Sequence, residues 1–390
     1  MTKSISYNYT AAIEDAALSS AAGAADLAVD PWVASSLLQK AIRRGDADLA
    51  ERAAVSLYRS RGRGIWRRFA VIAFEDVGVG SVEAVVETIA IGTNPSLRTA
   101  VGGDERALRH VARLLAQAPK DRSPDYLISN AHSEAVFGEF QCRVGAMTVP
   151  QRLDIVGDAG ATLVERAVAA YYSAGVEWWA EHRVGRGDLD TLMRTFRDLG
   201  VPPELLTATR IAAKLTREPI VIMSPLLWLA AASDPAPRVI ECQVPPYLML
   251  GDVPSYVLDK HTSAGKFAIQ RLVRENEAVR DVLANYVPEH RADKAAYVAA
   301  FYADAAPVSR RLDWRGSAEV ERMGTEADMV DVGASPDGVS PILNVFRDNL
   351  DHLISLRAET FGRRRARAHP LGQVQTPARA LPHTEVRICT

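Results

Sequence analysis

Hydrophobic residues recur with the period of a helix from Trp32 onward. In the first stretch the apolar positions follow i, i+4, i+5 and i+9, which places them on one face of a helix. They are Val33, Leu37, Leu38 and Ile42. Gly45 is expected to end this helix, because glycine readily adopts the left-handed conformation that closes helices. Asp46 can cap a second helix directly afterwards.

Helical spacing of apolar residues continues through most of the chain. The later helical stretches are residues 104–118, 151–184, 187–200, 203–217, 263–286 and 341–362. Residues 235–254 are rich in proline and predict extended or loop structure, and residues 314–341 are rich in Gly and Asp and look loop-like. Alternation typical of strands is scarce. We therefore expect a mainly α, all-α fold.

The chain divides into four parts on its patterns. Residues 1–29 are rich in Ala and Ser and weakly patterned, so we expect an N-terminal arm. Residues 30–148 and 149–361 are expected to form two helical domains. The remaining residues, 362–390, hold six arginines against one acidic residue, which predicts a disordered basic tail.

The composition is that of a globular protein, and it does not indicate a particular binding partner. The 390 residues are 48% hydrophobic and 24% charged, which is typical of a globular protein. The formal net charge is −2, so any attraction to DNA must come from the distribution of charges. The N-terminus lacks a signal-peptide pattern, and the most apolar stretch, residues 219–233, is too short to span a membrane. We expect a cytoplasmic protein with no membrane partner.

The sequence lacks the usual metal and nucleophile motifs. Cys142, Cys242 and Cys389 include no CxxC pair, which argues against a disulfide framework and a cysteine-built zinc site and fits a reducing compartment. The histidines show no HExxH spacing, and there is no G-x-S-x-G elbow. We expect no metal and no cofactor.

Spaced motifs within residues 30–130 resemble one known family. The residues that carry the resemblance are Ser35, Lys40, Arg43, Gly45 and Asp46, then Arg67, Arg68 and Phe69, then Ala73–Gly78, then Ala118, Pro119, Lys120 and Tyr126. Their order is similar to the C-terminal region of the RarA-like AAA+ ATPases, replication-associated recombination proteins related to Werner-helicase-interacting protein. The resemblance implies a helical clamp-loader-type module that drives oligomerisation. No G-x-x-x-x-G-K-[ST] phosphate loop occurs, so ATP hydrolysis is not implied.

Basic residues gather in three places and could bind DNA phosphates. They are Lys40, Arg43 and Arg44, then Arg63, Arg67 and Arg68, then Arg310, Arg311 and Arg315. Trp66 lies near the second group and could stack on a base. The alternative is that these residues are solvated helix faces, with Glu75 and Asp76 as internal partners. Under the DNA hypothesis, the basic residues should converge on one cationic surface once the helices pack.

A second polar group precedes the helix predicted at 263–286. Asp259, Lys260 and His261 are followed by Thr262, a residue type that caps helices. The Asp-x-His order resembles a segment of the helix-hairpin-helix DNA glycosylases, although their hairpin motif is missing here. The resemblance implies Asp259 as the catalytic carboxylate and His261 as a helper, and Lys260 could serve as an amine nucleophile. The alternative is that these residues cap and pack the helix.

Base excision would also need a pocket for a base flipped out of the DNA stack. Tyr172, Trp178 and Trp179 could supply its aromatic walls, and core packing is the alternative use of these side chains. Two hypotheses follow. The first is a DNA glycosylase that removes a modified or damaged base in genome maintenance or anti-phage defence. The second is a non-catalytic RarA-like adaptor, possible as a homo-oligomer, that binds DNA or a replication protein.

Overall fold

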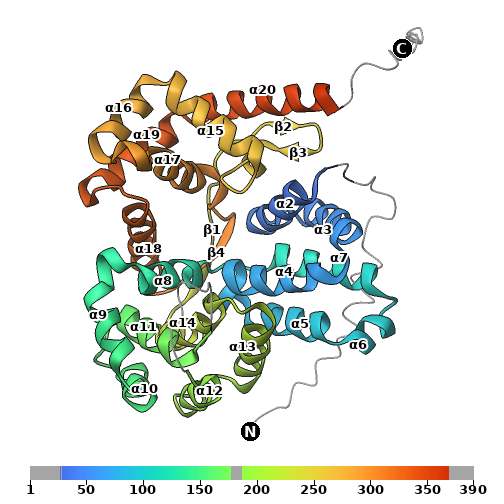
Figure 1. Ribbon diagram of the computed structural model, residues 1–390. Coiled ribbons are helices and arrows are strands. Elements are labelled where there is room, and N and C mark those ends of the chain that lie inside the picture. The colour runs from blue at the N-terminus through green and yellow to red at the C-terminus, as the bar shows by residue number, and fades with distance from the viewer. Residues whose placement is uncertain (1–26, 28, 177–186, 369–390) are drawn as a thin grey trace, which may run out of the picture.

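The computed structural model describes residues 27, 29–176 and 187–368, and helices dominate these ranges (Figure 1). The first helices are α2 (Pro31–Arg44), α3 (Ala47–Arg61), α4 (Ile65–Ile72), α5 (Val82–Thr93), α6 (Pro95–Ala100), α7 (Asp104–Gln117) and α8 (Ser123–His132). They are followed by α9 (Glu134–Ala146), α10 (Val149–Gly157), α11 (Leu163–Ala174), α12 (Leu189–Asp198), α13 (Pro203–Thr216) and α14 (Met223–Ala232). The last helices are α15 (Ser263–Glu275), α16 (Glu277–Tyr286), α17 (Ala292–Ala300), α18 (Ser317–Asp331), α19 (Val339–Asp348) and α20 (Leu350–Ala368).

Strands make up little of the described chain, which confirms the all-α prediction. They are β1 (Arg238–Glu241), β2 (Met249–Leu250), β3 (Val253–Pro254) and β4 (Arg310–Asp313). β1 pairs antiparallel with β4, and β2 pairs antiparallel with β3. Three of the four strands fall in the proline-rich stretch 235–254, where extended structure was predicted.

Local sequence explains where α2 and α3 begin and end. Asp30 caps α2, since its side chain accepts hydrogen bonds from two backbone N–H groups of the first turn. Pro31 occupies the first helical position, where no intrahelical N–H is needed. Gly45 ends α2 with a φ of 74°, in the left-handed region, and Asp46 caps α3. The predicted boundary between these two helices is confirmed.

The helices form an upper and a lower group (Figure 1). The upper group contains α15–α17, α19 and α20, and the lower group contains α4–α6 and α8–α14. Between them, α2 and α3 pack with α7, and α18 packs against α8. The β1–β4 pair also lies between the groups, and Lys120 forms an isolated bridge with Arg311 of β4. Helices from both sides of residue 148 pack together, including α5 with α13 and α8 with α11. The main hydrophobic core therefore runs across residue 148, where the sequence predicted a domain boundary.

Two sequence predictions about helix extent need correction. Residues 317–331, expected to be loop, form α18, which packs closely on α8 through Gly324. A Cβ atom at Gly324 would lie 2.5 Å from the Cα atom of Tyr126, so this contact needs glycine. Residues 362–368, assigned to the basic tail, belong to α20, whereas residues 369–390 lie outside the described residues. Most of the N-terminal arm also lies outside them.

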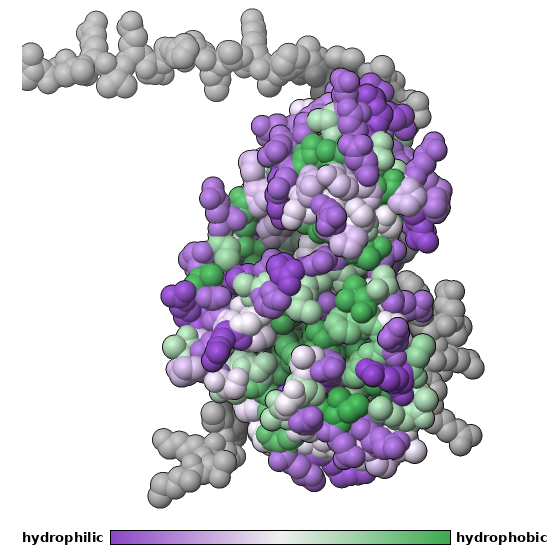
Figure 2. All heavy atoms as spheres, turned by 90° about the vertical axis from the view of Figure 1, so that its left-hand side faces the viewer, coloured by the Kyte–Doolittle hydropathy of each residue, from purple (hydrophilic) through white to green (hydrophobic). Residues whose placement is uncertain are grey.

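The surface is mixed in character. Figure 2 shows the left-hand side of Figure 1, where hydrophobic side chains gather in the lower half, the side on which α9, α10 and α11 lie. Among the described helices, none combines the length and apolar character that a membrane crossing requires.

Candidate functional site

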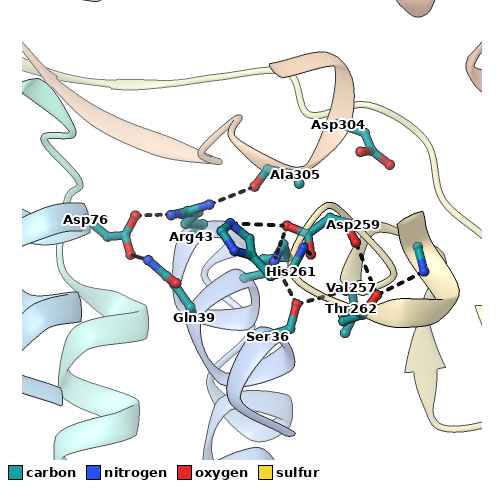
Figure 3. Close-up of polar contacts among 12 residues, drawn as sticks. Ser36, Gln39, Arg43, Asp76, Val257, Asp259, His261, Thr262, Asp304 and Ala305 are labelled. Carbon is teal, nitrogen blue, oxygen red and sulfur yellow. Dashed lines mark hydrogen bonds and ion pairs between the residues drawn. The ribbon is translucent and has the colours of Figure 1, made fainter. Parts of the chain in front are cut away.

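Asp259, the predicted catalytic carboxylate, lies in the protein interior (Figure 3). It is 0% exposed, and its Oδ2 atom lies 2.9 Å from Nζ of Lys40 on α2. Its Oδ1 atom accepts a hydrogen bond of 3.0 Å from the backbone N–H of His261. Thr262 caps α15 by accepting from the Gly265 N–H, as the sequence predicted. A carboxylate enclosed in this way cannot touch a flipped nucleotide in this conformation.

Lys40 is the buried partner of Asp259. Its ammonium also donates to the hydroxyl of Ser36, which donates in turn to the backbone carbonyl of Val257. Burial lowers the pKa of Lys40, and Arg43 lowers it further, while Asp259 acts in the opposite direction. Burial alone would raise the pKa of Asp259, but Lys40 and His261 bring it below its ordinary value. The pair therefore binds α2 to the segment before α15.

Of the other two members of the predicted catalytic group, His261 lies beside Asp259 (Figure 3) and Lys260 contacts an aromatic ring. His261 is largely exposed, and its Nε2 atom is 3.9 Å from the Asp259 carboxylate. The ammonium of Lys260 lies over the ring of Phe301, 4.2 Å from its centre. This contact is a cation–π interaction between the ammonium and the aromatic face.

Arg43 connects three parts of the chain (Figure 3). Its Nε atom lies 2.5 Å from Oδ1 of Asp76, and its Nη2 atom lies 2.9 Å from the carboxylate of Glu75. Its Nη1 atom donates to the carbonyl oxygen of Ala305 at 3.1 Å. The acids belong to one π-helical turn, η2 (Ala73–Val77), and the carbonyl belongs to a second, η8 (Phe301–Ala305). One guanidinium thus joins α2 to two irregular turns far apart in sequence.

The carboxylate of Asp76 forms ion pairs with two arginines, Arg43 and Arg122. Its Oδ1 atom also lies 3.2 Å from Nε of Arg122, and its Oδ2 atom accepts from the amide of Gln39 at 2.7 Å. Burial alone would raise the pKa of Asp76, but Arg43 and Arg122 bring it below the ordinary value. Asp76 therefore stays ionised inside the protein. Sequence analysis had offered it as an internal partner of the basic residues, and the geometry agrees.

A further buried ion pair lies on η8, the turn whose Ala305 carbonyl accepts from Arg43. Arg357 of α20 binds Asp304 of η8, and both side chains are 0% exposed. Arg44 donates to the Asp304 backbone carbonyl at 2.6 Å and lies over the ring of Tyr256. We call these buried charged side chains together the polar seam. Its members are Lys40, Arg43, Asp76, Arg122, Asp259, Asp304 and Arg357.

Among the described residues, most of the basic side chains predicted to bind DNA have partners within the protein. Lys40 and Arg43 are buried, so assigning them to DNA binding needs correction: their charges face interior acids. Five other arginines predicted to bind DNA are exposed or half-buried, and each lies beside an acidic or amide side chain. These pairs are Arg63 with Asp104, Arg67 with Glu218, Arg68 with Gln39, Arg310 with Glu241 and Arg311 with Glu321. Arg315 is exposed, and its backbone N–H donates to Asp234.

Of the three residues predicted to line a base pocket, only Tyr172 lies among the described residues. Tyr172 lies on α11 in the lower group, where its ring meets Tyr171 edge-on and the guanidinium of Arg152. Trp178 and Trp179 lie outside the described residues. Within the ranges that the structure describes, no group of three or more His, Cys, Asp or Glu side chains could hold a metal ion.

Sequence reasoning missed a small polar cavity beside the seam. It measures about 50 Å³, and its charged lining residues are Lys120, Asp121, Arg122, Arg311 and Glu321. The Oδ1 atom of Asp121 accepts from the N–H and hydroxyl of Ser123. Burial raises the pKa of Asp121 to about 6. The volume is enough for one or a few water molecules and too small for a nucleobase.

Comparison with protein-family models, curated protein sequences and solved structures gives no match to this chain. The resemblance of residues 30–130 to the RarA-like proteins therefore depends on the motif residues alone. Several of those residues, including Lys40, Arg43 and Asp76, belong to the polar seam.

Proposed function

We propose that this protein is a non-catalytic helical adaptor, which binds a partner protein without transforming it. The observation that carries the proposal is the buried ion pair between Lys40 and Asp259. The acid that best matched a catalytic motif is neutralised by its neighbour and closed off from substrate. Removing one member of such a pair leaves an uncompensated charge, so its main role is to hold the fold together.

The motif residues also support this proposal. In the family that residues 30–130 resemble, the corresponding module drives assembly, while the chemistry belongs to an ATPase core, whose phosphate-loop motif does not occur in the printed sequence. Lys40, Arg43 and Asp76 join α2 to η2 and to the segment before α15. A module fixed by internal charges offers a rigid surface to a partner, which lowers the entropic cost of binding.

The pairing of the arginines favours a protein partner over DNA. A phosphate that approached Arg67 or Arg311 would compete with the acids already beside them, Glu218 and Glu321. DNA affinity depends on the number of phosphates that a cationic surface neutralises. These two arginines therefore attract a phosphate less strongly than arginines without acidic neighbours would.

An excision assay tests the absence of catalysis. Duplexes that carry a panel of oxidised, alkylated, deaminated and hypermodified bases are incubated with the full chain and then treated with alkali. We expect no strand breaks above the buffer control. Breaks that are lost in Asp259→Asn and kept in Asp252→Asn would overturn the proposal, since Asp252 is an exposed acid on the same segment.

Binding is tested separately. Partners captured by crosslinking in cells are purified and mixed with the full chain, and the mass of the complex is measured by light scattering. We expect a stoichiometric complex in which neither protein is chemically changed. A chain that forms no complex with any purified candidate, or only one in which a candidate is modified, would contradict the adaptor proposal.

A further inference from the structure

An apolar groove of about 310 Å³ lies between α5 and α13, away from the polar seam. Its lining residues are Val86, Ile89, Ala90, Pro203, Glu204, Thr207, Ala208 and Ile211. The groove exists because α13 packs against α5 with small side chains at the contact, including Ala90 and Ala208. Larger side chains there would fill the space.

Apolar residues continue along the exposed side of α13 beyond the groove. Ile211 is 36% exposed and Leu215 is 39% exposed, and the two lie one turn apart on the same face. The exposed part of each side chain is apolar surface in contact with water, which costs free energy. A bound apolar surface would recover that free energy. Together with the groove they form a continuous apolar row along the helix.

A basic row runs beside this apolar row on α13. Arg210 and Lys214 are exposed one turn apart on an adjacent face of the helix, and Arg217 is exposed directly after its last residue. Arg210 reaches Asp190 of α12, with an Nε–Oδ1 distance of 2.5 Å. Arg217 occupies the C-terminal cap of α13 with a φ of 56°, a conformation that favours glycine. The chain thus has an arginine at a position where the backbone conformation favours glycine.

We propose that the groove binds an acidic amphipathic helix of a partner protein. Its apolar side chains would enter the groove beside Ile211 and Leu215, and its carboxylates would lie over the basic row. In this mode of recognition, called helix-in-groove, the bound helix places apolar side chains at positions i, i+3 or i+4, and i+7 into the groove. The inference deepens the adaptor proposal, on which it rests, by naming the site and the class of partner.

Charge and shape favour this occupant over a second copy of the chain. Two copies that met through this face about a two-fold axis would bring the two basic rows toward each other, because such an interface uses the same surface twice. Like charges facing across an interface are unfavourable. A nucleic acid would meet the basic row but would leave the apolar groove unfilled.

The test uses the full chain and a labelled synthetic peptide about five turns long. The peptide carries leucines at helical spacing on one face and glutamates on the neighbouring face, and a matched peptide has lysine in place of each glutamate. Fluorescence anisotropy measures binding. We expect saturable binding of the glutamate peptide that weakens as salt is raised, since exposed charges are screened, and much weaker binding of the lysine peptide.

Three variants locate the site. Ile211→Asp places a charge beside the groove, and we expect it to weaken binding by about tenfold or more. Arg217→Gly removes a charge at a position that suits glycine, and we expect a loss of about twofold to fivefold, the range for exposed ion pairs. Val136→Asp is the matched control, because Val136 is equally apolar, 49% exposed and on α9. Circular dichroism checks that each variant is folded.

The outcomes separate this inference from the adaptor proposal. Equal binding of both peptides, full binding by Ile211→Asp, or a Kd weaker than about 1 mM for the glutamate peptide would overturn the groove assignment. The adaptor proposal would survive any of these results, because it depends on the excision and complex-formation assays. Base excision by the chain would end the adaptor proposal whatever the peptide does.

Discussion

The polar seam and the α13 groove use similar residue types in opposite ways. In the seam, Arg43 and Arg357 are buried and each is matched to an aspartate. On α13, Lys214 and Arg217 are exposed beside exposed aliphatic side chains. Buried charges are costly unless they are paired, so they fix one arrangement of the chain. Exposed charges beside an apolar row cost little in the free protein and remain available to a partner.

This difference predicts that seam substitutions change stability and that α13 substitutions change binding. The largest expected effect is in the seam. Arg43→Met removes the cation that joins Asp76, Glu75 and Ala305. We expect the free energy of unfolding to fall by about 3–4 kcal/mol, because Asp76 keeps only one of its two buried arginines, Arg122, and Glu75 loses its buried cation. Urea denaturation measures this change, and a loss below about 1 kcal/mol would show that the seam does not hold the fold.

The next effect concerns the coupling between Lys40 and Asp259. Each single variant, Lys40→Met or Asp259→Asn, removes one charge and leaves its buried partner uncompensated. The double variant removes both charges. We expect it to be more stable than the sum of the single effects predicts, by about 2–3 kcal/mol in a double-mutant cycle. Simple additivity would mean that the two groups do not stabilise each other.

The physical difference between the two regions also explains what the sequence could predict. α2, α3 and α15 have clear apolar faces and capping residues, so their positions follow from local pattern. α18 was missed because its packing depends on the small residue Gly324, which contacts Tyr126 almost two hundred positions earlier, rather than on a strong apolar stripe. Local pattern cannot reveal such a contact.

The seam was beyond sequence reasoning for the same reason. Lys40 and Asp259 were both noted, but as separate sites, a DNA contact and a catalytic acid. They are 219 positions apart in the printed sequence, and Arg43 donates to Ala305 across 262 positions. The sequence of a basic run on a helix is the same whether its side chains face solvent or buried acids. Only the packing of α2 against η2 and η8 decides between these alternatives.

A smaller effect should appear in the pH dependence of stability. Burial raises the pKa of Asp121 from 3.8 to about 6, so the folded protein binds this proton more tightly than the unfolded chain. The contribution to stability is therefore complete below about pH 4 and is lost as the pH rises through about 6. We expect Asp121→Asn to gain stability relative to the parent chain at pH 8, by on the order of 2 kcal/mol, and little at pH 4.

Thermal unfolding at the two pH values measures this difference. Ser123→Ala is an informative companion, because Ser123 donates to the Oδ1 atom of Asp121 but carries no charge. It should lower stability at both pH values without the same change between them. If Asp121→Asn follows the parent chain from pH 4 to pH 8, the small cavity does not perturb this carboxyl group.

The smallest expected effect on stability lies on α13, where the comparison is sharpest. Leu215→Gln replaces an exposed aliphatic side chain with a polar one of similar length, in a helix that favours both residue types. We expect the free energy of unfolding to change by less than about 0.5 kcal/mol. Binding of the acidic peptide should nevertheless weaken, because the apolar row loses one anchor. Equilibrium denaturation and anisotropy on the same preparation separate the two effects. A large loss of stability would mean that Leu215 serves the core, and then the apolar row on α13 would be structural in the same sense as the seam.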